Sequence, residues 1–251
     1  MLLPLLLLAQ TAPAPAAGPP APQRGDRYAE CIDQARRDPA AAIRGATAWQ
    51  QADGGFLAQQ CLGIAEVTQG KWDAAAAAFE GAARVAEAAK DARSGGFWAQ
   101  AGNAWLAAGD AGKAQAALDA ALLGGTLDGL DLGEAHLDRA RALVAAGRQN
   151  DARADLDRAL TLAGDDPLAW LLSATLARRT GDLLRARKDI GRALALSPDD
   201  ASAQLEAGNI AAVEGNAAAA RTAWESAVRV SPGSAQAQAA SDALVAMGAT
   251  P

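Results

Sequence analysis

The chain has 251 residues, of which 51% are hydrophobic, and a formal net charge of −6, so it can form an apolar core, and its acidity argues against a nucleic-acid partner. It contains 71 alanines but only ten aromatic residues, which favours close-packed helices and excludes a mostly β, collagen-like or disulfide-dense fold. One histidine, His136, and two cysteines, Cys31 and Cys61, leave little for a zinc ribbon, a metal cluster or a Cys–His dyad.

The first 25 residues have the composition of a targeting segment and a linker. Residues 1–8 read MLLPLLLL, an apolar run too short to span a bilayer but typical of a secretory signal peptide. Small residues at Ala14 and Ala16 offer a cleavage site, so the signal peptide is expected to end near residue 16. Residues 11–25 are rich in Pro, Ala and Gly and are expected to form an unstructured linker.

The amino-acid composition also points to a bacterial source. Arginines outnumber lysines 19 to 4, which together with the alanine content is typical of a high-GC bacterial genome. We therefore predict a bacterial protein exported to the periplasm, without a membrane span in the mature chain. The alternative is a cytosolic protein with an uncleaved Pro/Ala tail.

Glycines then recur with a period of 34 residues, at Gly147, Gly181 and Gly215. Each follows a helix-like stretch and precedes a second one. In that second stretch an alanine, a larger apolar residue and another alanine follow at fixed offsets: Ala152, Leu156 and Ala159, then Ala186, Ile190 and Ala193, then Ala220, Trp224 and Ala227. Small residues let two helices cross closely, and the larger ones fill the space beside the crossing.

This pattern resembles the tetratricopeptide repeat (TPR) family, whose units are helical hairpins of about 34 residues. The resemblance predicts an all-α fold: an α-solenoid, wound as a right-handed superhelix, whose stacked hairpins share one core. With the glycine between the helices at repeat position 15, the five units are 56–89, 95–128, 133–166, 167–200 and 201–234. Residues 26–55 are expected to form a degenerate hairpin, and 235–251 a capping helix and tail with Ser234 as its N-cap.

The same resemblance puts Cys31 and Cys61 on the first helices of two adjacent hairpins, side by side. In an oxidising compartment they could form a disulfide. Closing a loop of about 30 residues is worth roughly 3–4 kcal/mol by the chain-entropy argument, which would tie a weak N-terminal hairpin to the array. The alternative is two separate buried thiols that pack as small hydrophobic groups.

No catalytic arrangement emerges from the sequence. His136 has Glu134 and Asp138 close in sequence, but residues two apart on a helix do not share a face. We therefore expect His136 to be a surface residue. The sequence predicts no enzymatic activity, no cofactor and no metal site.

The resemblance instead implies a binding function for the concave groove, which in TPR proteins is lined by repeat positions 2, 5, 9, 12 and 13 of the first helices and takes extended peptides or partner helices. The candidates here are Asn103, Arg141, Thr175 and Asn209 at position 9, Arg178 and Arg179 at positions 12 and 13, and Leu137, Leu171 and Leu205 at position 5. No lysine stands at position 5, so the dicarboxylate clamp of some family members is absent.

Each residue type has a chemical reason to be in a groove. An asparagine amide both donates to and accepts from a peptide backbone, the arginines suit a carboxylate, and the leucines form an apolar stripe for an amphipathic helix. Solvated arginines at helix ends are the alternative. We predict a non-catalytic scaffold that binds an acidic or amphipathic segment of a protein or peptide partner; the alternative is a cytosolic adaptor or regulator.

Overall fold

The computed structural model describes residues 24–248, and in this part of the chain every regular element is an α-helix. The predicted signal peptide lies outside the described residues. In chain order the helices are α1 (Arg24–Arg37), α2 (Pro39–Gln51), α3 (Gly55–Thr68), α4 (Trp72–Ala88), α5 (Ser94–Ala108), α6 (Ala111–Leu123), α7 (Gly129–Ala145), α8 (Gln149–Leu162), α9 (Pro167–Thr180), α10 (Leu183–Leu196), α11 (Ala201–Val213), α12 (Ala217–Val230) and α13 (Ala235–Gly248).

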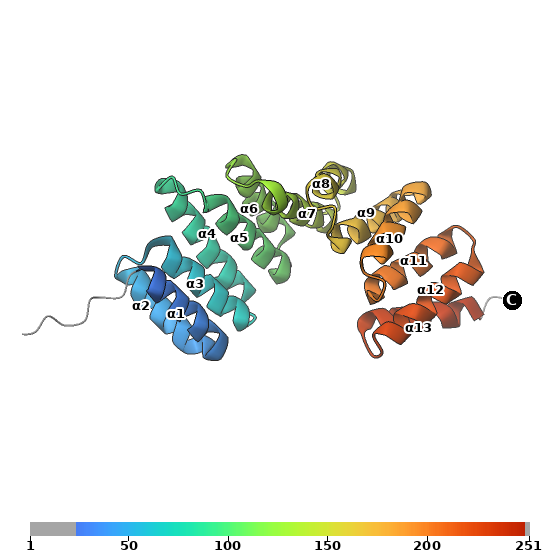
Figure 1. Cartoon of the computed structure of the whole chain (residues 1–251), viewed down its shortest axis with the longest axis horizontal. Coiled ribbons are helices and arrows are strands. Elements are labelled where there is room, and N and C mark those ends of the chain that lie inside the picture. Colours follow the sequence, from blue (N-terminus) through green and yellow to red (C-terminus); the bar gives the residue numbers. More distant parts are fainter. Residues whose placement is uncertain (1–23, 249–251) are drawn as a thin grey trace, which may run out of the picture.

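The helices pair in sequence and stack into an arch. Each helix packs on the next one in the chain. The first helices of neighbouring hairpins are also in contact, for example α5 with α7 and α9 with α11. Figure 1 shows α7 and α8 at the top of the arch, with the N-terminal and C-terminal hairpins as its two arms. The predicted all-α solenoid is thereby confirmed. The unit boundaries given above stay a prediction.

The glycine at repeat position 15 ends the first helix of every unit with a positive φ. The five values lie between 69° and 84°, for Gly70, Gly109, Gly147, Gly181 and Gly215. Glycine reaches this left-handed conformation without a steric penalty, whereas a side chain would strain it. The 34-residue period of glycines is therefore a period of tight turns between helices.

A second small residue, at repeat position 8, lets the two helices of a hairpin approach each other. A Cβ added there would collide with the large side chain at position 24 of the same unit, which pairs Gly63 with Phe79, Gly102 with Leu118 and Gly208 with Trp224. In the third and fourth units alanines take this place, and both are buried: Ala140 and Ala174. Much of the alanine excess belongs to this shared core, where small side chains set the spacing of the helices.

Side-chain N-caps fix where α2 and α13 begin, near the two ends of the array. Asp38 caps α2 by accepting a hydrogen bond from the backbone of Ala41, with Pro39 in the first turn. At the other end the Ser234 hydroxyl accepts from the amide of Ala237, so α13 begins where the sequence predicts. Such caps satisfy backbone N–H groups that the first turn leaves without partners.

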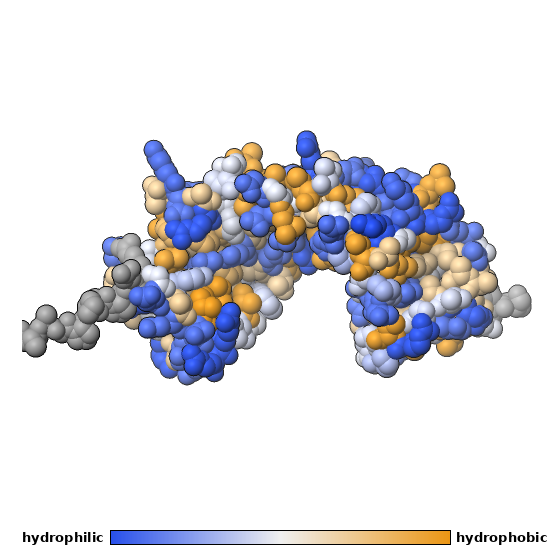
Figure 2. All heavy atoms as spheres, viewed as in Figure 1, coloured by the Kyte–Doolittle hydropathy of each residue, from blue (hydrophilic) through white to orange (hydrophobic). Residues whose placement is uncertain are grey.

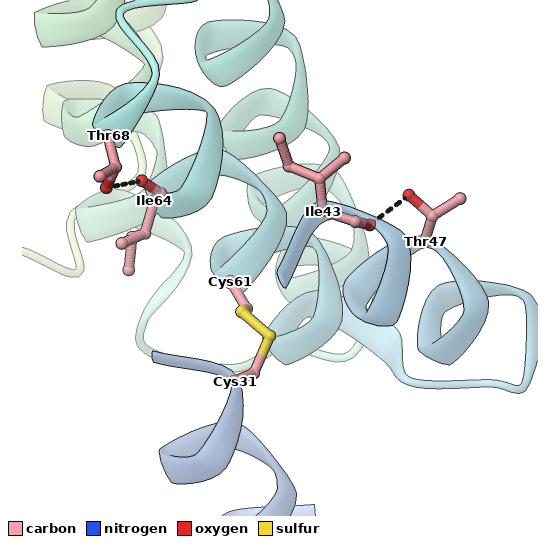
Figure 3. Close-up of a disulfide and its surroundings, with 6 residues drawn as sticks. All are labelled: Cys31, Ile43, Thr47, Cys61, Ile64 and Thr68. Carbon is pink, nitrogen blue, oxygen red and sulfur yellow. Dashed lines mark hydrogen bonds between the residues drawn. A yellow bond between two sulfur atoms is a disulfide. The ribbon is translucent and has the colours of Figure 1, made fainter. Parts of the chain in front are cut away.

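A disulfide joins α1 to α3. Cys31 and Cys61 are linked with their Cα atoms 6.2 Å apart, as Figure 3 shows. On either side of the bond, Thr47 and Thr68 donate hydroxyl hydrogen bonds to the carbonyl groups of Ile43 (2.8 Å) and Ile64 (3.0 Å) in their own helices. The bond fastens the first hairpin to the second.

No helix among residues 24–248 has the length and apolar character needed to cross a membrane.

Candidate functional site

Three of the predicted groove residues lie around a single cleft. Arg141 comes from α7, and Thr175 and Arg179 come from α9. These two helices are the first helices of the third and fourth units and lie on the inner side of the arch, with α8 outside them (Figure 1). The cleft has a volume of about 430 Å³, and Figure 2 shows the broad hollow under the arch onto which this side of the molecule faces.

The cleft is mainly apolar. Leu156 of α8 and Leu176 of α9 are almost fully buried and form its base. Its walls are made by small and aliphatic side chains of α7 and α9: Ala140, Val144, Ala145 and Leu172. Arg141, Thr175 and Arg179 are the only polar residues of its lining, and none of the lining residues is a carboxylate. The arrangement can take an apolar group and an anion together.

The two guanidinium groups of the cleft differ in what they already bind. Arg141, whose side chain is 41% exposed, pairs with Asp138 one turn earlier at 2.8 Å. Arg179 is exposed and makes no ion pair with any residue in the described part of the chain. Asp138 itself is buried, and burial raises the pKa of its carboxyl, although Arg141 and Asn103 partly oppose that shift. Arg179 is therefore the cation most available to a ligand.

The neighbouring junctions of the inner surface are closed by polar bridges. Between α5 and α7, the amide of Asn103 donates to Asp138 at 2.5 Å. Between α9 and α11, Arg178 donates to both oxygens of Glu206, at 2.6 and 3.2 Å. Asn209 donates to the same Glu206 at 3.4 Å and accepts from the indole of Trp224 at 3.1 Å. These bridges link the first helices of successive units.

Three of the predicted ligand-binding residues therefore already have partners within the protein. Asn103, Arg178 and Asn209 each donate at least one side-chain hydrogen bond to a carboxylate of the protein, and their role in holding a ligand stays a prediction. The physical reason is that a buried carboxylate needs donors, and the nearest amide or guanidinium supplies them.

The leucines of the predicted apolar stripe also have partners within the protein, and their role as a ligand surface stays a prediction. Leu137 is only 3% exposed and belongs to the core formed with Leu156 and Leu176. Leu171 and Leu205 are half-buried and pack against the cores of their own hairpins. Stacking of the units covers position 5, because an apolar side chain at a helix junction gains more from burial than from exposure.

Sequence reasoning missed repeat position 6, which decides where the cleft lies. This position holds Asp138 on α7 and Glu206 on α11, the two carboxylates of the bridges, but Leu172 on α9. Position 6 of α9 therefore provides no carboxylate for a bridge to α7, and Leu172 becomes a wall of the cleft. Comparing position 6 across the five units is the signal that could have found this site.

His136 is not the surface residue that we expected. Its Nδ1 lies 2.8 Å from Asp155 of α8, and its side chain is only 17% exposed. Arg139 donates to both oxygens of the same Asp155, at 2.8 and 2.7 Å, and to Asp119 of α6 at 2.9 Å. Hydrogen bonding to Asp155 raises the pKa of Arg139. His136 thus belongs to an ion cluster that joins α6, α7 and α8.

No metal centre adds to this picture: within residues 24–248, no group of three or more His, Cys, Asp or Glu side chains is arranged to hold an ion.

Comparison with known proteins points to one family. Its sequence profile, described as a tetratricopeptide repeat, matches residues 137–200 and, in a second register, 171–240. No curated protein matches the chain in sequence.

Several solved structures share the fold. PilW, described as a widely conserved type IV pilus biogenesis factor, is 19% identical with a TM-score of 0.70, over 86% of this chain and 96% of that one. Pseudomonas aeruginosa pilF is 17% identical with a TM-score of 0.67, again over 86% and 96%. YrrB, described as a TPR protein with an unusual peptide-binding site, is 19% identical with a TM-score of 0.58, over 78% and 96%. At these identities the likeness shows the fold alone.

Proposed function

We propose that the chain, which a tetratricopeptide repeat profile matches over residues 137–200 and 171–240, is a non-catalytic scaffold that binds a segment of a partner protein along the inner surface of its arch. The observation that carries this proposal is the cleft between α7 and α9, a mainly apolar recess with two guanidinium groups at its edges. Fold relatives include YrrB, whose description names a peptide-binding site.

The physical advantage of this surface is that it already exists before the partner arrives. The base of the cleft is held by the buried core of the α7–α8 and α9–α10 hairpins, so little ordering of the scaffold accompanies binding. A partner segment that buries an apolar side chain there removes that side chain from water, which favours association. The partner is a protein or peptide with an acidic or amphipathic segment.

Site-specific photocrosslinking in the native cells tests this function. A photoreactive residue replaces Thr175 on the inner surface, and in a matched control it replaces Arg158, an exposed residue of α8 outside the cleft. We expect discrete crosslinked partners from position 175 and none of the same species from position 158. Equal crosslinking from both positions, or crosslinking from 158 alone, contradicts the proposal.

We further propose that the protein works in the bacterial periplasm. An apolar N-terminal run of signal-peptide type and a disulfide between α1 and α3 support this location, because disulfides persist mainly in oxidising compartments. Mass spectrometry of the mature protein tests the location. Cleavage near residue 16 supports export, whereas a mature chain that retains residues 1–8 supports the cytosolic adaptor instead.

A further inference from the structure

The inner surface of the arch has one junction that differs in chemistry from its neighbours. Carboxylates of the chain itself close the junctions α5–α7 and α9–α11, where Asp138 and Glu206 accept from Asn103 and Arg178. At the junction α7–α9 the corresponding residue is Leu172, and the place of the bridge is taken by the cleft. This junction therefore has two guanidinium groups on its edges, and within residues 24–248 no carboxylate bridges α7 to α9.

We propose that a partner supplies the missing acceptor. The partner segment carries a large aliphatic or aromatic side chain that enters the cleft and, next to it, a carboxylate that pairs with Arg179. This inference rests on the proposed scaffold function and names the chemistry of its partner at one site.

The apolar half of this recognition follows from the lining. Leu156, Leu172 and Leu176, with Val144 and two alanines, surround about 430 Å³, which is room for one large side chain with part of its backbone. A polar side chain would lose its hydration there without gaining partners, because Thr175 is the only uncharged polar residue of the lining. An apolar side chain has no such loss, and its removal from water favours binding.

The acidic half follows from the charges. Arg179 is exposed and has no ion-pair partner among residues 24–248, and Arg141 donates only one hydrogen bond, to Asp138. A guanidinium has five N–H donors, so both groups can accept a carboxylate as a further partner, and Arg179 can bind one with two parallel hydrogen bonds. A basic segment would be repelled by the same two charges. The net charge of −6 makes this local preference stand out against the whole chain.

Peptide display on the full chain tests the proposal. A random-peptide phage library is selected on the wild-type protein, the enriched peptides are sequenced, and their affinities are measured by fluorescence anisotropy. We expect enriched peptides to share a large apolar residue next to Asp or Glu.

Two variants and two matched controls then probe the cleft itself. Ala145→Trp fills the cleft from its exposed edge, and its control is Ala146→Trp at the next residue, which is also exposed but does not line the cleft. Arg179→Glu reverses the charge at the edge, and its control is Arg158→Glu on α8. We expect Ala145→Trp and Arg179→Glu each to weaken binding by at least about tenfold, and the controls by less than about twofold. Circular dichroism confirms that every variant is folded.

A photoreactive label on the enriched peptides separates failure of this inference from failure of the scaffold function. Crosslinks to α7 and α9, lost in Ala145→Trp, support the proposal. Crosslinks to the inner surface of other first helices, with affinity unchanged in Ala145→Trp and Arg179→Glu, overturn it but leave the scaffold function standing. Crosslinks confined to the second helices, or no enrichment over a blank surface, count against both.

Discussion

The N-terminal hairpins and the middle of the arch share one repeat but are held together by different forces. None of the buried side chains of α1–α6 is charged; these helices are joined by the disulfide, a core around Phe79, Trp105 and Leu118, and a contact between the rings of Phe56 and Phe97 at 5.7 Å. The four cation–π contacts found in the described residues also lie there.

In α7–α10 buried charges take over part of this role. Asp155 and Asp189 are 4% and 2% exposed. Asp155 accepts from Arg139 and neighbours His136, and Asp189 accepts from Ser173 at 2.5 Å and Arg185 at 3.2 Å. The backbone geometry of the hairpins tolerates either solution. Apolar contacts do not depend on the relative orientation of the two side chains. Buried ion pairs do require a particular geometry, and their formation costs desolvation of both charges.

The cleft lies in the same middle region, α7–α10, whose helices are joined by buried charges. Hydrogen bonds of charged side chains join α7 to α8, α8 to α9 and α9 to α10, while the cleft between α7 and α9 is left without a bridge. A rigid support around an unfilled recess is what a preformed binding site requires. Variants of each region should therefore respond differently.

The largest expected effect is at Asp155. Asp155→Ala leaves Arg139 without its main partner in a half-buried site, and we expect a loss of about 3–5 kcal/mol in the free energy of unfolding. Asp151→Ala is the control, because Asp151 is exposed and pairs only with Arg148; its loss should be about 0–1 kcal/mol. Urea denaturation measures both. Similar losses in the two variants would show that the buried ion cluster contributes no more to stability than an exposed ion pair.

Removal of the disulfide should act on the other region. Replacing Cys31 and Cys61 by Ala together should cost about 2–4 kcal/mol, and the cost should be local, because each unit of a solenoid contacts only its neighbours. Hydrogen exchange should show faster exchange in α1–α3 and unchanged exchange in α7–α10. Free thiols in the denatured, unreduced wild-type protein would show that the bond does not form.

Helix crossings should give an intermediate effect. Gly102→Ala places a Cβ against Leu118, and such overpacking costs about 1–3 kcal/mol. Gly191 lies inside α10 with open space around its Cα, so Gly191→Ala should stabilise the protein by about 0.5–1 kcal/mol. Thermal unfolding of the two variants compares them. A stabilised Gly102→Ala would mean that the crossing is looser than the structure indicates.

The smallest effect concerns pH. Burial raises the pKa of Asp138 above its ordinary value, so the folded state holds this proton more tightly than the unfolded state. The contribution of Asp138 to stability therefore falls as pH rises from the ordinary carboxyl pKa through the raised one. Asp138→Asn should change stability at neutral pH by less than about 1 kcal/mol, and its stability relative to wild type should decline as pH is lowered through that window. Parallel stability curves would contradict this assignment.

Much of the fold could be predicted from the sequence because its determinants are local and periodic. Gly147, Gly181 and Gly215 mark turns that need a positive φ, and a glycine paired with Trp224 at fixed spacing marks a close helix crossing. Ser234 begins the last helix through a hydrogen bond within one turn. Each of these features depends on residues within one hairpin, and the same pattern recurs in several units of the repeat.

The binding surface was decided by tertiary structure. Periodicity identifies the face of a helix on which a residue lies, but not which atoms of the next hairpin meet it. Arg178 and Arg179 are adjacent in sequence, yet Glu206 of α11 binds the first, and no ion pair forms to the second within the described residues. Leu137 has the repeat position expected of a groove residue, but its side chain is buried in the core. Whether a donor or an apolar side chain is free depends on partners in another helix, and only the stacking of the hairpins settles those.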